Sequence, residues 1–128
     1  MITKYNLYVK IQLCRGKIYM TIKLDYHSNL YLSAGIDTLK LDKMKDKLEK
    51  NPFLSGLFVI YISKNLSDQL DIIDAKMLIQ RYYQNNAIHV VGLAESHEEA
   101  IEIVKRIVDD CIQTRGDCAI KEYLLCGV

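Results

Sequence analysis

The chain has no surplus of charge of one sign. Seventeen Lys and Arg residues against sixteen Asp and Glu residues give its 128 residues a net charge of +1. Proteins that bind DNA or RNA non-specifically need an excess of basic side chains to neutralise phosphates. The balance therefore disfavours a nucleic-acid partner.

Long apolar runs and a secretion signal are also missing. The apolar runs end well short of the roughly 18 residues that cross a membrane. The start, MITKYNLYVK, has no basic segment followed by an apolar one. We therefore expect a cytoplasmic protein without membrane contact, in which the four cysteines are reduced thiols. No C-x-x-C pair occurs, so the spacing argues against a metal site, and we expect no cofactor.

Proline and linker segments are scarce. Pro52 is the single proline, and we find no repeat or low-complexity tract. We therefore predict one α/β domain over residues 1–128. Its mixed sheet would combine an N-terminal antiparallel hairpin with later parallel strands, and three helices would pack on it. The expected order is two strands, a short third strand, and then helix followed by strand three times.

The clearest local pattern is an alternation of apolar and polar residues on both sides of Arg15-Gly16. Alternation with period two indicates strands, and two residues between such runs indicate a hairpin. A register slipped by one residue would separate every apolar pair. The predicted pairs are Leu13 with Ile18, Ile11 with Met20, Val9 with Ile22, and Leu7 with Leu24.

From residue 30 onward, short apolar runs alternate with amphipathic stretches. Strands covered on both faces are continuously apolar, whereas helices repeat apolar residues every three to four positions. Strands separated by helices imply parallel pairing. The pattern predicts strands at Leu30–Ile36, Gly56–Ser63, Ala87–Ala94 and Cys118–Cys126, and helices at Leu41–Lys50, Ser67–Asn85 and Glu98–Thr114, the last closed by Gly116.

The stretch VVGLAESHEEA (residues 90–100) combines a strand, one glycine and a helix start, where proteins often bind phosphate. Ser96 followed by Glu99 forms a capping box, in which the two side chains satisfy free backbone amides. Glu95, Glu98 and Glu99 would also repel an anion. We therefore interpret this stretch as a helix cap, with a ligand at Ser96 as the less favoured alternative.

Three further residues are candidate ligand contacts. Lys64 and Ser67 offer a positive charge and a hydroxyl before the predicted helix Ser67–Asn85, although acidic residues in its first turn favour an ordinary cap. His89 would be a general base beside a cleft, or otherwise a core histidine with one hydrogen bond. No catalytic triad can be identified from spacing, because triads assemble in space.

The predicted helix Ser67–Asn85 has two apolar stripes on nearly opposite sides. Leu66, Leu70, Ile73 and Met77 form the first. A sheet covers one side of a helix, so the second stripe needs cover from the same chain or from a partner. Exposed apolar stripes mark association sites, and a two-fold dimer is the simplest case. The candidate partner interface consists of Ile72, Ala75, Ile79, Tyr82 and Tyr83.

The order of predicted elements resembles the STAS-type regulatory domains of anti-sigma-factor antagonists. Those domains carry a phosphorylatable Ser or Thr in a D-S-[ST]-G turn at the start of their second helix. The matching junction here reads Asn65-Leu66-Ser67-Asp68, which lacks that signature. The resemblance therefore implies a functional role for Ser67 alone.

These observations favour a non-enzymatic binding or regulatory module that associates with a second copy or another protein through its predicted second helix. The alternative is an enzyme that binds a small molecule or nucleotide at the carboxyl ends of the parallel strands. Residues 63–67 and 93–96, together with His89, would line that site.

Overall fold

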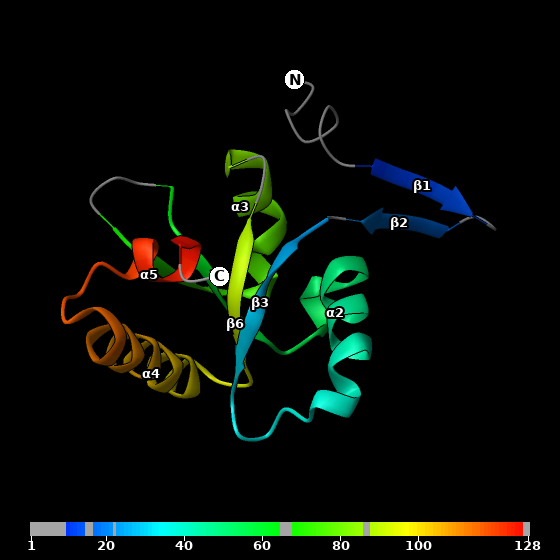
Figure 1. Ribbon diagram of the computed structural model, residues 1–128. Helices are drawn as coiled ribbons and strands as arrows, with labels where there is room; N and C mark the ends of the chain where they lie inside the picture. Colours follow the sequence, from blue (N-terminus) through cyan, green and yellow to red (C-terminus); the bar gives the residue numbers. More distant parts are fainter. Residues whose placement is uncertain (1–9, 15–16, 22, 65–67, 86–87, 127–128) are drawn as a thin grey trace.

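The computed structural model describes residues 10–14, 17–21, 23–64, 68–85 and 88–126. Figure 1 shows their arrangement. The strands are β1 Lys10–Cys14, β2 Lys17–Thr21, β3 Asp25–Leu32, β4 Phe58–Ile62, β5 Leu70–Asp74 and β6 His89–Ala94. The helices are α2 Leu41–Lys50, α3 Leu78–Asn85, α4 His97–Arg115 and α5 Ile120–Cys126. Three short 3-10 helices join them: η1 Thr38–Lys40, η2 Pro52–Leu54 and η3 Ala75–Met77.

The main sheet is mixed and has the strand order β3-β6-β4-β5. This confirms the predicted α/β class, with a mixed sheet and helices packed on it. The strand directions differ from the prediction, however. β3 and β6 are parallel, whereas β4 runs antiparallel to both β6 and β5. The reversal arises because β4 and β5 follow each other without the helical crossover that parallel neighbours require.

Helices cover both faces of this sheet, with α4 and α5 on one side and α2 on the other (Figure 1). We call the two buried apolar groups the α4 cluster and the α2 cluster. The α4 cluster contains Ile60, Val91, Ala94, Ala100, Ile103, Ile107, Cys111, Ile120 and Leu124. The α2 cluster contains Leu24, Ile36, Leu48, Leu57, Val59, Tyr61, Ile73, Ala75, Leu78, Ile88, Val90 and Leu93.

The segment predicted as helix Ser67–Asn85 contains a strand, β5, before the short helices η3 and α3, so that prediction was wrong. Successive side chains of a strand point to opposite faces. Leu70 and Ile72 accordingly pack against the α4 cluster, whereas Ile73 belongs to the α2 cluster. The two apolar sides therefore belong to a strand covered on both faces.

The C-terminal segment predicted as strand Cys118–Cys126 is helix α5, so that prediction was also wrong. Ile120 and Leu124 lie four residues apart, which places both against the α4 cluster. The Gln69 side-chain oxygen accepts hydrogen bonds from the backbone N–H groups of Ile120 (2.6 Å) and Lys121 (3.2 Å). A distant side chain thus satisfies free amides of the first turn. With β5 and α5 in place, the element order departs from the STAS-type order.

Helix α4 confirms the predicted helix and both of its ends. The Ser96 hydroxyl accepts a hydrogen bond from the Glu99 N–H (3.1 Å) and donates one to the Glu99 carboxylate (3.3 Å). At the other end, Gly116 adopts φ 81°, the left-handed conformation that glycine tolerates best. Among the described residues, no helix is long and apolar enough to cross a membrane.

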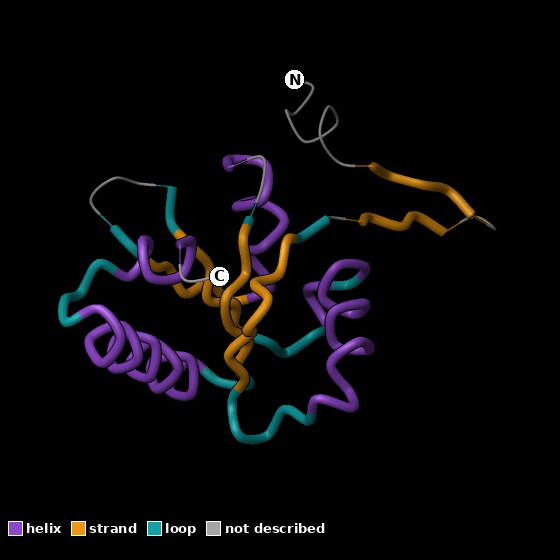
Figure 2. The backbone as a smooth tube through the Cα atoms, viewed as in Figure 1, coloured by secondary structure: helices purple, strands orange, loops and turns teal. Residues whose placement is uncertain are grey.

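The N-terminal hairpin has the predicted register where it is described. Leu13 lies opposite Ile18 and Ile11 opposite Met20. The two outer predicted pairs involve residues 7, 9 and 22, outside the described residues. The hairpin forms a separate two-stranded sheet, apart from the main sheet (Figure 2), and not one end of it as predicted.

Strand β3 begins at Asp25, five residues before the predicted start at Leu30. The polar stretch DYHSN, which precedes the predicted strand, is therefore the first part of β3. Its pairing with β6 shifts register between Tyr26 and Tyr31, so the polar residues lie in an irregular part of the ladder.

Candidate functional site

The carboxyl ends of β3 and β6 form a switch point in the sheet. The two strands are parallel neighbours. After β3 the chain passes to α2 on one face, whereas after β6 it passes to α4 on the other (Figure 1). Open α/β sheets bind ligands in the crevice that such diverging connections leave. The topology therefore makes this end of the sheet a candidate ligand site.

Ser33 is the first residue beyond β3 at this crevice. Its N–H donates to the carbonyl of Leu93 (3.1 Å), which extends the pairing of β3 with β6 by one residue. Its own carbonyl then accepts a hydrogen bond from the N–H of Ile36 (3.0 Å), which turns the chain toward α2. These backbone bonds fix Ser33 in place, and only 5% of the residue is exposed.

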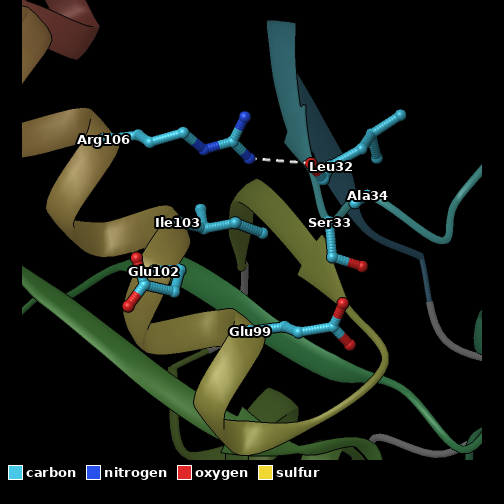
Figure 3. A pocket seen from close by; sticks show the side chains of 7 residues that line it. All are labelled: Leu32, Ser33, Ala34, Glu99, Glu102, Ile103 and Arg106. Atoms are coloured by element: carbon cyan, nitrogen blue, oxygen red, sulfur yellow. Dashed lines mark hydrogen bonds between the residues drawn. The ribbon is translucent and has the colours of Figure 1, made fainter.

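A pocket of about 280 Å³ opens between this strand end and the first turns of α4 (Figure 3). Positions 99, 102 or 103, and 106 are three to four residues apart, so α4 presents them on one face. The lining residues are Leu32, Ser33, Ala34, Glu99, Glu102, Ile103 and Arg106.

The Ser33 hydroxyl is a buried polar group without a hydrogen-bond partner among the described residues. Burying a hydroxyl in this state costs about 1–3 kcal/mol, and most buried polar groups avoid the cost by pairing. Figure 3 shows the hydroxyl and the Glu99 carboxylate reaching toward the space between β3 and α4. A hydroxyl can both donate and accept a hydrogen bond.

The guanidinium of Arg106 already has partners at the rim of the pocket. It donates to the carbonyl of Leu32 (2.7 Å) and lies 5.8 Å from the centroid of the Tyr31 ring. The Tyr31 hydroxyl in turn donates to Asp110 (2.6 Å). Burial, followed by this hydrogen bond, raises the pKa of Tyr31 above its ordinary value. Arg106 and Tyr31 therefore tie the end of β3 to α4.

Carboxylates dominate the remaining charge of the pocket. Glu99 and Glu102 line it, and Glu98 adds a further carboxylate to the first turn of α4. Glu95 lies against Gly35, where an added side-chain carbon would collide with its carboxylate. The positive end of the α4 dipole is thus already balanced by carboxylates, which makes the pocket unfavourable for an anion.

The structure separates the predicted ligand residues. Ser96 lies at this end of the sheet as the cap of α4. His89 lies at the opposite end because it begins β6, and Lys64 lies there because β4, which it follows, runs antiparallel to β6. Ser67 lies outside the described residues. The predicted crevice therefore does not bring these residues together.

His89 has a second histidine beside it. Its Nε2 atom lies 3.4 Å from Nδ1 of His27, and the two rings meet edge to face. Burial and the neighbouring charge of His89 lower the pKa of His27. This pair joins the starts of β3 and β6, far along the sheet from the pocket.

The residues predicted as a partner interface serve mainly in the core. Ile72 packs against the α4 cluster, and Ala75 is buried in the α2 cluster. Ile79 and Tyr82 are partly buried against the α2 cluster. The side chain of Tyr83 lies outside the described residues. Their predicted arrangement as one helical stripe was wrong, since β5, η3 and α3 divide them.

Sequence reasoning missed Ser33, Glu102 and Arg106 as pocket residues. The small residues that follow Leu32 (Ser33, Ala34 and Gly35) mark a strand end, which was an available signal for Ser33. In the sequence, Arg106 is one of several charged residues on the polar side of the predicted helix Glu98–Thr114. Its contact with β3 depends on which strand lies beside β6.

Comparisons with known protein families, curated proteins and solved structures found no match to this chain. Within the described residues, no three His, Cys, Asp or Glu side chains lie close enough together to hold a metal ion. The pocket is therefore the candidate functional site of the described residues.

Proposed function

We propose that the protein is a non-enzymatic binding module for a small ligand that presents an ammonium group to Glu99 and a hydrogen-bonding group to Ser33. The observation that carries the proposal is the unpartnered, buried Ser33 hydroxyl in a pocket at the switch point. A ligand that pairs with this hydroxyl would remove a free-energy penalty that the empty protein carries.

The charges in the pocket support a cation. The Glu99 carboxylate attracts an ammonium group. Glu102 is already paired with Lys105 (3.3 Å), and Arg106 is engaged with Leu32 and Tyr31. Hydrogen bonds between an ammonium group and a carboxylate are about twice as strong as neutral ones. A phosphate at the same place would face repulsion from the carboxylates, which argues against a nucleotide.

The size of the pocket supports a small ligand. Sites for drug-sized molecules occupy roughly 300–1,000 Å³, and this pocket holds about 280 Å³. Leu32 and Ile103 supply an apolar wall for a short carbon chain. A small aliphatic amine or amino alcohol fits both the volume and the lining.

The lining also favours binding over catalysis. Of the described residues that line the pocket, none is a histidine or a cysteine. A serine nucleophile requires an adjacent base within hydrogen-bond reach, and the hydroxyl of Ser33 has no such partner. The histidine pair lies at the other end of the strands.

The test is a titration followed by amide NMR spectra, with a panel of small aliphatic amines and amino alcohols as probes. We expect at least one probe to shift the amide signals of Ser33, Glu99 and Arg106. Glu99→Gln should weaken its binding by about 10- to 100-fold, since it removes a hydrogen bond to a charged group, and Ser33→Ala by up to about tenfold, since it removes a neutral one.

Glu98→Gln is the matched control, because Glu98 has the same charge in the same helical turn but does not line the pocket. It should leave the affinity nearly unchanged. Equal losses in Glu98→Gln and Glu99→Gln would show a general charge effect and would contradict a site at Glu99. Binding of inorganic phosphate or a nucleotide to the pocket, with silence from every amine, would overturn the proposal.

A further inference from the structure

Strand β5 forms one edge of the main sheet and, in the described part of the chain, pairs with β4 alone. The Ser63 N–H donates to the Gln69 carbonyl, and the Ala75 N–H donates to the Leu57 carbonyl. Hydrogen-bonded positions alternate along an antiparallel pair. Odd-numbered residues of β5 therefore bond to β4, and the backbone groups of Leu70, Ile72 and Asp74 face outward.

Exposed apolar side chains lie at one end of this edge. Phe53 and Leu54 of η2 are 50% and 68% exposed, and Met77 of η3 is 51% exposed. The 3-10 helices η2 and η3 lie in contact, and η3 follows β5 directly. Monomeric proteins usually shield sheet edges with charge, short length or covering elements. β5 is short and carries Asp71 and Asp74, but an apolar patch continues the edge beyond its end.

We propose that β5 pairs antiparallel with β5 of a second copy of this chain, around a two-fold axis at Ile72. This proposal is independent of the ligand pocket. In this register Ile72 lies opposite itself, and Leu70 lies opposite Asp74 of the second copy. All three outward-facing residues then form hydrogen-bonded pairs, and the two main sheets become one continuous sheet.

Charge complementarity favours this register. It brings Lys76, in η3 directly after β5, to the same end of the interface as Asp68 of the second copy, and symmetry repeats the arrangement. Both side chains are exposed. A shift of two residues toward the strand start would instead place Asp71 opposite Asp71, and like charges in direct opposition are destabilising. The edge is thus complementary to itself in one particular alignment.

The test measures the oligomeric state of the full chain by sedimentation over a range of concentrations. We expect a monomer–dimer equilibrium without larger assemblies, because a two-fold interface is closed. Ile72→Pro should shift the protein to monomer, since it removes an outward N–H while leaving the bonds to β4 in place. A chain that stays monomeric at high concentration, or forms open-ended assemblies, would overturn the proposal.

A charge reversal tests the register and does not depend on whether the proline variant folds. Lys76→Glu should weaken the dimer by about tenfold or more, since it places two acidic residues in opposition. Combining it with Asp68→Lys should restore most of the lost affinity. If neither Lys76→Glu nor Asp68→Lys alone weakens the dimer, another surface forms it and the proposed pairing is wrong.

Discussion

Replacing Ser33 with alanine should make the ligand-free protein more stable. The residue is 5% exposed, and its hydroxyl has no hydrogen-bond partner among the described residues. An unpaired buried hydroxyl costs about 1–3 kcal/mol relative to the unfolded chain, where water satisfies it. Alanine removes this penalty and keeps the backbone bonds of Ser33 with Leu93 and Ile36.

The expected net gain is about 1 kcal/mol, because the lost contacts of one oxygen atom offset part of the penalty. Each such contact contributes only about 0.1–0.2 kcal/mol. For a chain of this length, 1 kcal/mol corresponds to a rise in melting temperature of about 3–4 °C. Urea denaturation gives the free energy, and a thermal scan checks the shift.

Ser96→Ala is the matched control, since it makes the same chemical change where the hydroxyl is paired. It removes the cap of α4, where the Ser96 hydroxyl accepts from the Glu99 N–H, and should cost about 1 kcal/mol. The two substitutions should therefore move stability in opposite directions. If Ser33→Ala also lowers stability, the hydroxyl has a favourable partner in the empty protein, and the main argument for a ligand fails.

Three further predictions concern the packing, the turn and the pH response. Gly92→Ala should cost about 1–2 kcal/mol, because the added carbon would lie 3.0–3.3 Å from its neighbours, including Ile60 Cδ1 at 3.1 Å. Ile60→Val removes that atom. In urea denaturation it should therefore lower the free energy of unfolding less in the Gly92→Ala variant than in the unsubstituted protein. Gly116→Ala should lower the melting temperature by a few degrees, since φ 81° strains any other residue by about 1 kcal/mol. Burial and the neighbouring His89 lower the pKa of His27. As the pH falls, His27 is therefore protonated in the unfolded chain before it is protonated in the folded protein. Stability should fall as the pH drops below about 6.5; His27→Asn should reduce the fall, and an equal fall in the variant would contradict this role.

Features set by near neighbours in the chain could be predicted from the sequence. The helix Leu41–Lys50 was placed with the bounds that α2 has, and α4 begins beside the predicted cap Ser96 and ends before Gly116. The hairpin register followed from alternation and a two-residue loop. Each of these depends on contacts within a few residues, or between strands joined by a short turn.

Strand β5 shows why the middle of the chain was misassigned. The sequence LDIIDAKM satisfies both a helical spacing and the alternation of a strand buried on both faces. One local signal could have separated them. The Asp74 carboxylate accepts from the Lys76 N–H (3.0 Å), which is a helix cap and places the helical start after Asp74.

The pocket could not be predicted because it depends on strand order. Sequence reasoning placed the carboxyl ends of all later strands together, which would unite Lys64 with Ser96. The β4–β5 pairing reverses β4, so these residues lie at opposite ends. The position of Ser33 at the pocket depends on the pairing of β3 with β6, which the sequence does not reveal. Burial without a partner is a property of the assembled sheet.

The two proposed surfaces lie toward opposite edges of one sheet, so ligand binding and dimer formation should be separable by substitution. The pocket lies at β3 and β6, whereas the association edge is β5, with β4 between them. Neighbouring strands lie about 4.8 Å apart, so β3 and β5 are separated by about 14 Å. Substitutions this far apart usually have additive effects. Ser33→Ala should therefore leave the dimer affinity unchanged. One route could connect the sites: the α4 cluster contains Ile103 from the pocket wall and packs against Ile72 from the edge. A ligand that shifts the dimer equilibrium would have to move α4 on the sheet, and amide signals along α4 would report that movement.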